Sequence, residues 1–315
     1  LWRKSLRRLN IMSHSFLKES KLYIVYGGNK YRIYTTTALD FSQTFAQESY
    51  PVKTLHDQTK MLEGATITSA NAVDFSFTVP FTKEKDESPI IELLQSLDNN
   101  EQLTGFDMYI ETGSSVFKVD GAVITSGDFS ISPNSQFAVS VQGQGTKLER
   151  VGNESYTIPG NLQSESSSRT PLLVYPVISI DSLSMNSIIS VNVNIQNNIT
   201  WTNYKTLQKS LNVTNSSNVM RPSDYVVEKR IVSGTINQYQ TDNNITQFDN
   251  FSTNSNITLK AVEVGKAANA TPFFQIQLNP ASYTARMQVA DVYQQSYDFS
   301  SLDNTALGTR ITQYS

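Results

Sequence analysis

The sequence predicts a mainly β protein that contains two tandem domains of one kind. Three observations support this: an uncharged polar composition, repeated alternation of apolar and polar side chains, and one element order that occurs twice. Charged residues make up 17% of the chain, against about 25% in a typical domain. Ser, Thr and Asn, which are poor helix formers, must therefore cover much of the surface. The 15 Tyr and 15 Phe residues favour strands.

The first half opens on a predicted β-hairpin. Apolar and aromatic residues run from Leu22 to Tyr26, and the chain returns through Tyr31 and Ile33. Between the two runs, Gly27 and Gly28 can supply the positive φ angles that tight hairpin turns need. The beginning of the domain therefore reads as two antiparallel strands.

Alternation predicts five further strands in this half. They cover residues 39–45, 73–79, 106–111, 116–125 and 129–141. The glycine at the centre of Ser126-Gly127-Asp128 predicts a turn between the last two of these strands.

One segment of the first half reads as an amphipathic helix. Ser88 is a suitable N-cap residue, and Pro89 fits the first helical position. An apolar stripe then runs from Ile90 to Leu97 at helical spacing. The sequence thus predicts one flanking helix beside the strands.

The second half repeats this element order at an offset of about 155 residues, which is a sign of duplicated architecture. Its helix position is occupied by the weaker segment 242–251. The strands expected in this half cover residues 174–180, 189–195, a segment ending in 231–239, 257–264, 273–278 and 283–292.

These patterns divide the chain into four parts. We expect an N-terminal arm at residues 1–15, a first domain at 16–151 and a second domain at 171–315. Residues 152–170 between the domains are rich in Gly, Ser, Asn and Pro. That composition is typical of a linker or a surface excursion.

Each half also contains a long polar segment where the alternation stops, at residues 47–64 and 201–221. Loops of this length inside a compact domain are usually functional. Isolated large apolar residues occur in both segments, and we expect a neighbouring subunit to cover them, although such a loop can also pack on its own side chains. These expected contact residues are Tyr50, Leu55, Met61, Leu62, Trp201, Tyr204, Leu207 and Leu211.

The polar faces of the long strands are built from small side chains that are neutral or acidic. A face without cations cannot form the phosphate contacts that dominate nucleic-acid affinity. It therefore suits a wet, non-adhesive conduit, although plain solvent exposure of a half-buried sheet gives the same pattern. The residues of this face are Asp40, Ser42, Thr44, Asp74, Ser76, Thr78, Ser140, Gln142, Ser190, Asn192 and Asn194.

The sequence offers no support for catalysis, a cofactor or a metal site. It has no cysteine and two histidines, His14 and His56, which lie far apart in the chain. No phosphate-binding loop, nucleophile elbow or zinc motif occurs. Asp40 and Asp74 can share a sheet face, but no apolar pocket is in view to raise a pKa, as a glycosidase pair needs. We therefore expect a non-enzymatic protein.

Charge and hydropathy narrow the range of partners. The net charge is −3, and the only basic cluster lies between Arg3 and Arg8, whereas nucleic-acid-binding proteins carry basic patches. No apolar run reaches the roughly 18 residues of a membrane span. We expect neither firm DNA binding nor a membrane partner.

The element order resembles that of the tail tube proteins of long-tailed bacteriophages. The resemblance rests on ALDFSQTFAQ, the segment ESYPVKTLHDQTKMLEG and AVDFSFTVPF, followed by the capped helix SPIIELLQSL. VITSGDFSISPNSQFAVSVQGQG resembles the closing hairpin of that domain. The likeness covers residues 16–305. The second half departs from it, because its helix is poor and its long segment carries Trp201.

The resemblance implies a fold, an assembly and partners. It implies two β-sandwich or open-barrel tube domains, each with one flanking helix and a long loop between strands. Two fused domains are similar to siphophage major tail proteins, in which three chains imitate a hexameric ring. Stacked rings would form a hollow tube for DNA ejection. The implied partners are further copies and the tape measure, tail tip and tail terminator proteins, and the implied location is the virion tail, assembled in the host bacterial cytoplasm.

Two other readings remain open from the sequence. A two-domain carbohydrate-binding or adhesive β-protein would explain the abundance of Asn and aromatic residues through sugar contacts. A hydrolase on a β-scaffold is a further reading, but no constellation of side chains supports it.

Overall fold

The computed structural model describes residues 20–35, 39–54, 57–95, 102–181, 183, 185–202, 221–244, 250–289, 291–301 and 310–313. The protein is mainly β, as predicted, and among these residues it has one helix, α1 (Ser88–Gln95). The strands of the first half are β1 (Lys21–Tyr26), β2 (Asn29–Ile33), β3 (Asp40–Thr54), β4 (Asp57–Pro80), β5 (Phe106–Glu111), β6 (Val116–Ile131), β7 (Ala138–Gly145) and β8 (Lys147–Gly152). The remaining strands are β9 (Asn161–Leu162), β10 (Val174–Ile180), β11 (Ile188–Thr202), β12 (Asp224–Tyr239), β13 (Phe251–Glu263), β14 (Phe274–Val289), β15 (Tyr293–Ser301) and β16 (Arg310–Gln313).

The two halves share one strand order. In the first half the hydrogen-bonded order is β3-β4-β7-β6-β5-β1, and in the second half it is β11-β12-β15-β14-β13-β10. β8 joins the first half of β6, and β16 joins the first half of β14 on the corresponding side. Each strand of this shared order therefore has a counterpart in the other half, whereas β2 and β9 of the first half have none.

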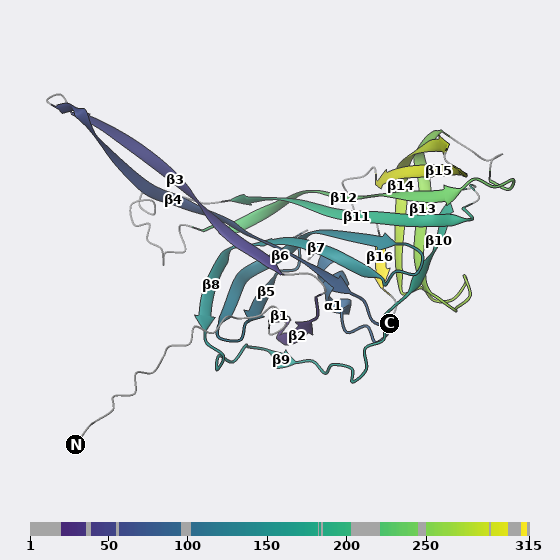
Figure 1. The fold of residues 1–315 in the computed structure, drawn as a ribbon, viewed down its shortest axis with the longest axis horizontal. Helices are drawn as coiled ribbons and strands as arrows, with labels where there is room; N and C mark the ends of the chain where they lie inside the picture. Colours follow the sequence, from purple (N-terminus) through teal and green to yellow (C-terminus); the bar gives the residue numbers. More distant parts are fainter. Residues whose placement is uncertain are drawn as a thin grey trace, which may run out of the picture.

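One strand pairing joins the halves into a single sheet. Ser126–Ile131 of β6 pair antiparallel with Val191–Gln196 of β11. The result is a run of eight neighbouring strands in the order β3-β4-β7-β6-β11-β12-β15-β14. Figure 1 shows β11 and β12 lying along β6 and β7. We call the β6–β11 pairing the internal seam.

An aromatic cluster packs the two halves together beneath this sheet. Phe129 of β6 stacks on Phe274 of β14 with ring centroids 4.9 Å apart, and Phe81 meets Phe273 at 5.6 Å. Phe137 contacts rings from both halves. All five side chains are buried. The main hydrophobic core is therefore continuous across the halves.

The predicted helix exists as α1, which begins at Ser88, one residue before the predicted first helical position, and packs its apolar face onto the sheet. Its buried Leu94 lies over Gly127 of β6, where an added Cβ would come within 2.5 Å of the Leu94 side chain. The predicted turn at residues 126–128 is wrong, because this stretch is part of the continuous strand β6. Gly127 is needed for the close approach of the helix, a use of glycine that the sequence does not separate from a turn.

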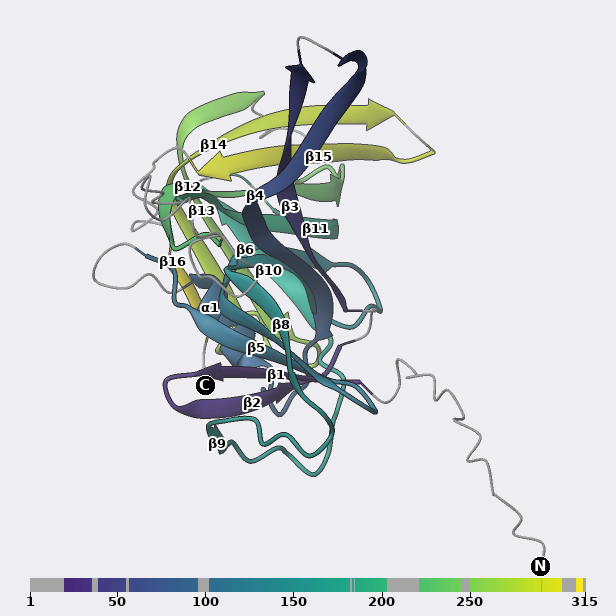
Figure 2. The ribbon, with the colours of Figure 1, turned by 90° about the vertical axis from the view of Figure 1, so that its left-hand side faces the viewer.

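The first polar segment is not a loop. Residues 47–64 continue β3 and β4 into a long two-stranded arm, with pairings that reach Thr54 and Asp57. Figures 1 and 2 show this arm projecting away from the body of the molecule. Alternation marks a strand when one face packs on a core. A projecting arm lacks that constraint, which explains why its sequence reads as a loop.

The second half differs from the prediction in its strand ends. The expected strands at 273–278 and 283–292 are one strand, β14, and β15 follows it where no strand was expected. β11 runs past residue 195 to Thr202 and pairs there with β12. Most of the second polar segment, residues 203–220, and part of the weak helix position, residues 245–249, lie outside the described residues.

The predicted linker lies against the first half. β9 pairs with β2, and Arg169 forms an ion pair with the buried Glu87 at 2.6 Å. The Arg169 guanidinium also stacks over the ring of Tyr34 at 3.4 Å. Figure 2 shows β9 beside β1 and β2 at the base of the molecule.

Candidate functional site: a polar sheet face and its free edges

The residues predicted to form a polar face lie on neighbouring strands of one sheet. The eleven residues expected on it are all exposed or half-buried, and they alternate with buried neighbours such as Val73, Phe75 and Phe77. They come from β3, β4, β7 and β11, which all belong to the eight-strand run. The arrangement follows from the two-residue period of a strand, which sends successive side chains to opposite faces.

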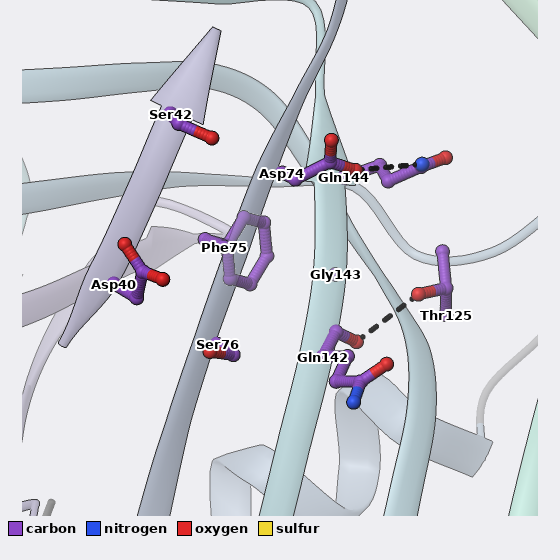
Figure 3. Close-up of a pocket in the computed structure, with 9 residues that line it drawn as sticks. All are labelled: Asp40, Ser42, Asp74, Phe75, Ser76, Thr125, Gln142, Gly143 and Gln144. Carbon is purple, nitrogen blue, oxygen red and sulfur yellow. Dashed lines mark hydrogen bonds between the residues drawn. The ribbon is translucent and has the colours of Figure 1, made fainter.

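Figure 3 shows the part of this face on β3, β4, β6 and β7. Gln144 donates a hydrogen bond to Asp74 at 2.9 Å, and Thr125 donates one to the carbonyl of Gln142 at 3.2 Å. Asp40 and Asp74 do share this hollow. Phe75 is the one aromatic residue in its lining, and it is buried. No exposed ring is thus available in this hollow for stacking on a sugar.

The polar face continues across the internal seam into the second half. Asn194 of β11 donates a hydrogen bond to Asp128 of β6 at 2.5 Å. Between β12 and β11, the Asn237 side chain donates a hydrogen bond to the Ser190 hydroxyl at 3.0 Å. The same chemistry of small polar side chains therefore extends beyond the first domain.

Sequence reasoning missed the cations on this face. Arg286 of β14 forms an ion pair with Asp298 of β15 at 2.5 Å, and its side chain is 72% exposed. Thr235 of β12 donates to the same carboxylate at 2.9 Å. The polar alternation of Ser282, Thr284, Arg286 and Gln288 could have revealed this strand. The carboxylates of Asp40, Asp74, Asp128, Glu228 and Asp298 lie on the face with Arg286 and with Lys229, which is exposed opposite Asn198.

The expected inter-subunit residues are only partly described. Tyr50, Met61 and Leu62 lie in the strands of the β3–β4 arm. Trp201 is half-buried within its own chain: its ring lies 5.1 Å from that of Tyr225, and its indole nitrogen donates to Gln144 at 2.9 Å. The other four residues, Leu55, Tyr204, Leu207 and Leu211, lie outside the described residues.

The far ends of β11 and β12 dock onto helix α1 of the first half. Arg230 of β12 donates hydrogen bonds to the carbonyls of Gln95 and Leu94 at 2.9 and 3.1 Å, at the C-terminus of α1. Asn197 of β11 donates to Ile124 at 3.2 Å. Burial lowers the pKa of Arg230 to about 10, so it stays charged at neutral pH. A cation at this end of a helix satisfies carbonyls that have no partner within the helix.

The eight-strand run has a free edge at each end. β3 pairs with β4 alone among the described strands. On β14, β13 covers the outer side up to Thr284, and Ala285 donates its N–H to Asn250 at 2.7 Å. Beyond that point, Arg286–Val289 have β15 on one side and no described strand on the other. Met287 and Val289 are 43% and 74% exposed there.

Two other kinds of site are absent from the described part of the chain. No group of three or more His, Cys, Asp or Glu side chains there could hold a metal ion. No helix among those residues is both long and apolar enough to cross a membrane.

Comparison with known proteins identifies the family. No curated protein matches the chain. The model of the Bacteriophage Baseplate Tube Protein Family matches residues 12–309. This match supports a phage tail-related tube protein with a structural role in the virion tail, without singling out the siphophage major tail proteins. The chain belongs to the Bacteriophage Baseplate Tube Protein Family.

Proposed function

We propose that three copies of this chain close into a ring that forms one layer of a phage tube through which DNA passes. The observation that carries the proposal is the eight-strand run, which has a continuous polar face and two free edges. Exposed sheet edges invite pairing with another chain, and closure into a barrel removes them. The duplicated halves would give the ring true threefold and approximate sixfold symmetry.

Strand number supports a ring of several chains. An eight-stranded barrel is filled by its own side chains, whereas barrels of 16–18 strands leave an aqueous channel. One chain contributes eight strands to the run. Three chains would give about 24 strands, and at about 4.8 Å per strand the wall would measure about 37 Å across even without strand tilt.

The charge of the polar face supports passage of DNA without binding. Among the described residues of this surface, the carboxylates outnumber the two cations, Arg286, which is already paired, and Lys229, so no basic stripe forms. Affinity for nucleic acid depends chiefly on contacts between Lys or Arg and phosphates. A wall with this composition would let a polyanion slide rather than hold it.

The family description favours a place in the baseplate part of the tube over the main tail tube. We therefore propose that the ring stacks on other tube rings near the tail tip. The tape measure protein would occupy its bore before ejection. Assembly would take place in the cytoplasm of the host bacterium. The arm of β3 and β4 would reach a neighbouring subunit or ring.

Electron microscopy of the purified protein tests the proposal. We expect threefold rings or short stacks with an open centre. A protein that stays monomeric at high concentration, and under the same conditions binds immobilised glycans, would exclude the tube and favour an adhesive β-protein.

A further inference from the structure

The repeat gives a residue-by-residue correspondence between the two halves. In the first half, Phe75 of β4 lies opposite Gly143 of β7, and an added Cβ on this glycine would meet the ring at 2.1 Å. In the second half, the pair is reversed: Phe299 of β15 lies over Gly234 of β12, with its ring 2.7 Å from such a Cβ. Each half thus has one ring over one glycine at the same point of the strand order.

Strand registers extend this correspondence to both free edges. Counting from the two ring–glycine pairs, Asp128 of β6 corresponds to Arg286 of β14, and Ser42 of β3 corresponds to Asn194 of β11. The fully buried Ala122 and Ala281 also fall at corresponding positions, which checks the alignment independently. The observed pairing of β6 with β11 therefore provides a template for pairing β14 with β3 of a second copy of the chain.

The internal seam covers apolar residues that the free edge leaves open. Phe129 and Ile131 of β6 are 2% and 5% exposed, and they lie opposite Val193 and Val191 of β11. Their counterparts on β14 are Met287 and Val289, which are 43% and 74% exposed. Apolar side chains exposed at an unpaired strand edge mark a surface that can pair with another chain.

The free edge of β3 presents the matching set. Leu39 and Phe41, the counterparts of Val191 and Val193, pack against the core but remain partly exposed. Asp40 and Ser42 point to the polar face. Asp40 would stand diagonal to Arg286 in the transferred register, so that opposite charges meet across the junction.

We propose that Arg286–Val289 of β14 pair antiparallel with Asp40–Ser42 of β3 and the preceding Leu39 in a second copy of this chain. The register places Ser42 opposite Arg286, Phe41 opposite Met287, Asp40 opposite Gln288 and Leu39 opposite Val289. This junction, the external seam, rests on the proposed ring and defines its contact. It is shorter than the six residue pairs of the internal seam, because β13 already covers Thr284 and Ala285.

Disulfide trapping tests the register, because the chain has no cysteine of its own. Residues directly opposite in antiparallel strands have Cα atoms about 4.5–5.5 Å apart, within the disulfide range, whereas diagonal neighbours lie about 7–8 Å apart. We expect the double variant Asp40→Cys/Gln288→Cys to form covalent dimers and trimers on oxidation. The matched variant Ser42→Cys/Gln288→Cys, displaced by two residues, should not.

A third variant, Ser130→Cys/Asn192→Cys, bridges the internal seam within one chain and verifies the oxidation conditions. Covalent trimers from the first variant alone support the external seam. Bridging in the displaced variant instead, with rings still visible by microscopy, overturns the register and leaves the proposed function standing. Rings with no bridge in either variant overturn the edge pairing. No rings and no bridge, with the internal control bridged, overturn both.

Discussion

The two halves of this protein differ at the outer edges of two corresponding strands, β6 and β14. In the first half, the outer part of β6 is covered by β11, and Phe129 is buried against Phe274. In the second half, the outer part of β14 ends in the exposed Met287 and Val289. The edge of β6 is thus paired within the chain, whereas the edge of β14 has no partner strand among the described residues.

The second half therefore has two roles. It supplies the partner strand, the aromatic cover and the helix cap for the first half. It also presents an edge that none of the described residues completes. The internal contacts should therefore control folding, and the open edge should control assembly.

The largest expected effect is on assembly. Met287→Glu should abolish rings, because the substitution places a carboxylate opposite the partner's Phe41 at the external seam. The stability of the single chain should change by no more than about 0.5 kcal/mol, since the site is exposed. Sedimentation velocity and thermal unfolding measure the two effects. Val264→Glu, at an exposed position away from this edge, is the matched control. Normal rings from the Met287 variant would contradict the external seam.

The next effect is on the joint between the halves. Phe274→Ala removes a buried ring that packs on Phe129 and Phe137. We expect a loss of about 3–5 kcal/mol in the free energy of unfolding, as for other large-to-small changes in cores. Phe251→Ala, at a 68% exposed ring, should cost far less. Equal losses from the two variants in urea unfolding would show that the aromatic cluster does not hold the halves together.

A smaller loss is expected at the helix cap. Arg230→Ala leaves the carbonyls of Leu94 and Gln95 without their charged donor, and we expect a cost of about 2–3 kcal/mol. The neighbouring Lys229 is exposed, and Lys229→Ala serves as control. Hydrogen exchange should also rise at the C-terminus of α1 in the Arg230 variant. Unchanged exchange there would argue against this docking.

The smallest effect concerns an ion pair between the halves. Glu263 pairs with Lys266 and with Lys83 of the first half, both at 2.7 Å, and these bonds hold the pKa of its carboxyl below the ordinary 4.5. The stabilisation is complete above about pH 4.5 and is lost as the pH falls through the folded-state pKa. Glu263→Gln should lower the stability by less than about 1 kcal/mol at pH 7 and by less still at pH 3. Thermal unfolding measures the difference in stability between the unmodified protein and the Glu263→Gln variant. A difference that is larger at pH 3 than at pH 7 would contradict this account.

Local signals in the sequence predicted the elements that face a core. The alternation at residues 73–79 and the cap at Ser88 led to a strand and a helix that the structure contains. Gly127 was misread because the reason for the glycine is Leu94, which is distant in sequence. The arm at residues 47–64 was misread because it projects from the body.

The polar face was largely predictable, whereas its edges were not. A period of two identifies which side chains share a face, as it did for Asp40 and Asp74. It does not tell which strand stands next to which. The exposure of Met287 indicates a pairing edge only when β14 is known to correspond to β6. That correspondence requires the strand order of both halves.

The internal seam also has a kinetic consequence. Its two strands belong to one chain, so they meet at the effective concentration set by a tether, which reaches millimolar values for short flexible linkers. In a ring of three copies, half of the junctions between domains would already have formed once each chain has folded. Only the other half would need encounters between molecules. Duplication within one chain thus halves the number of slow, concentration-dependent steps on the way to a closed ring.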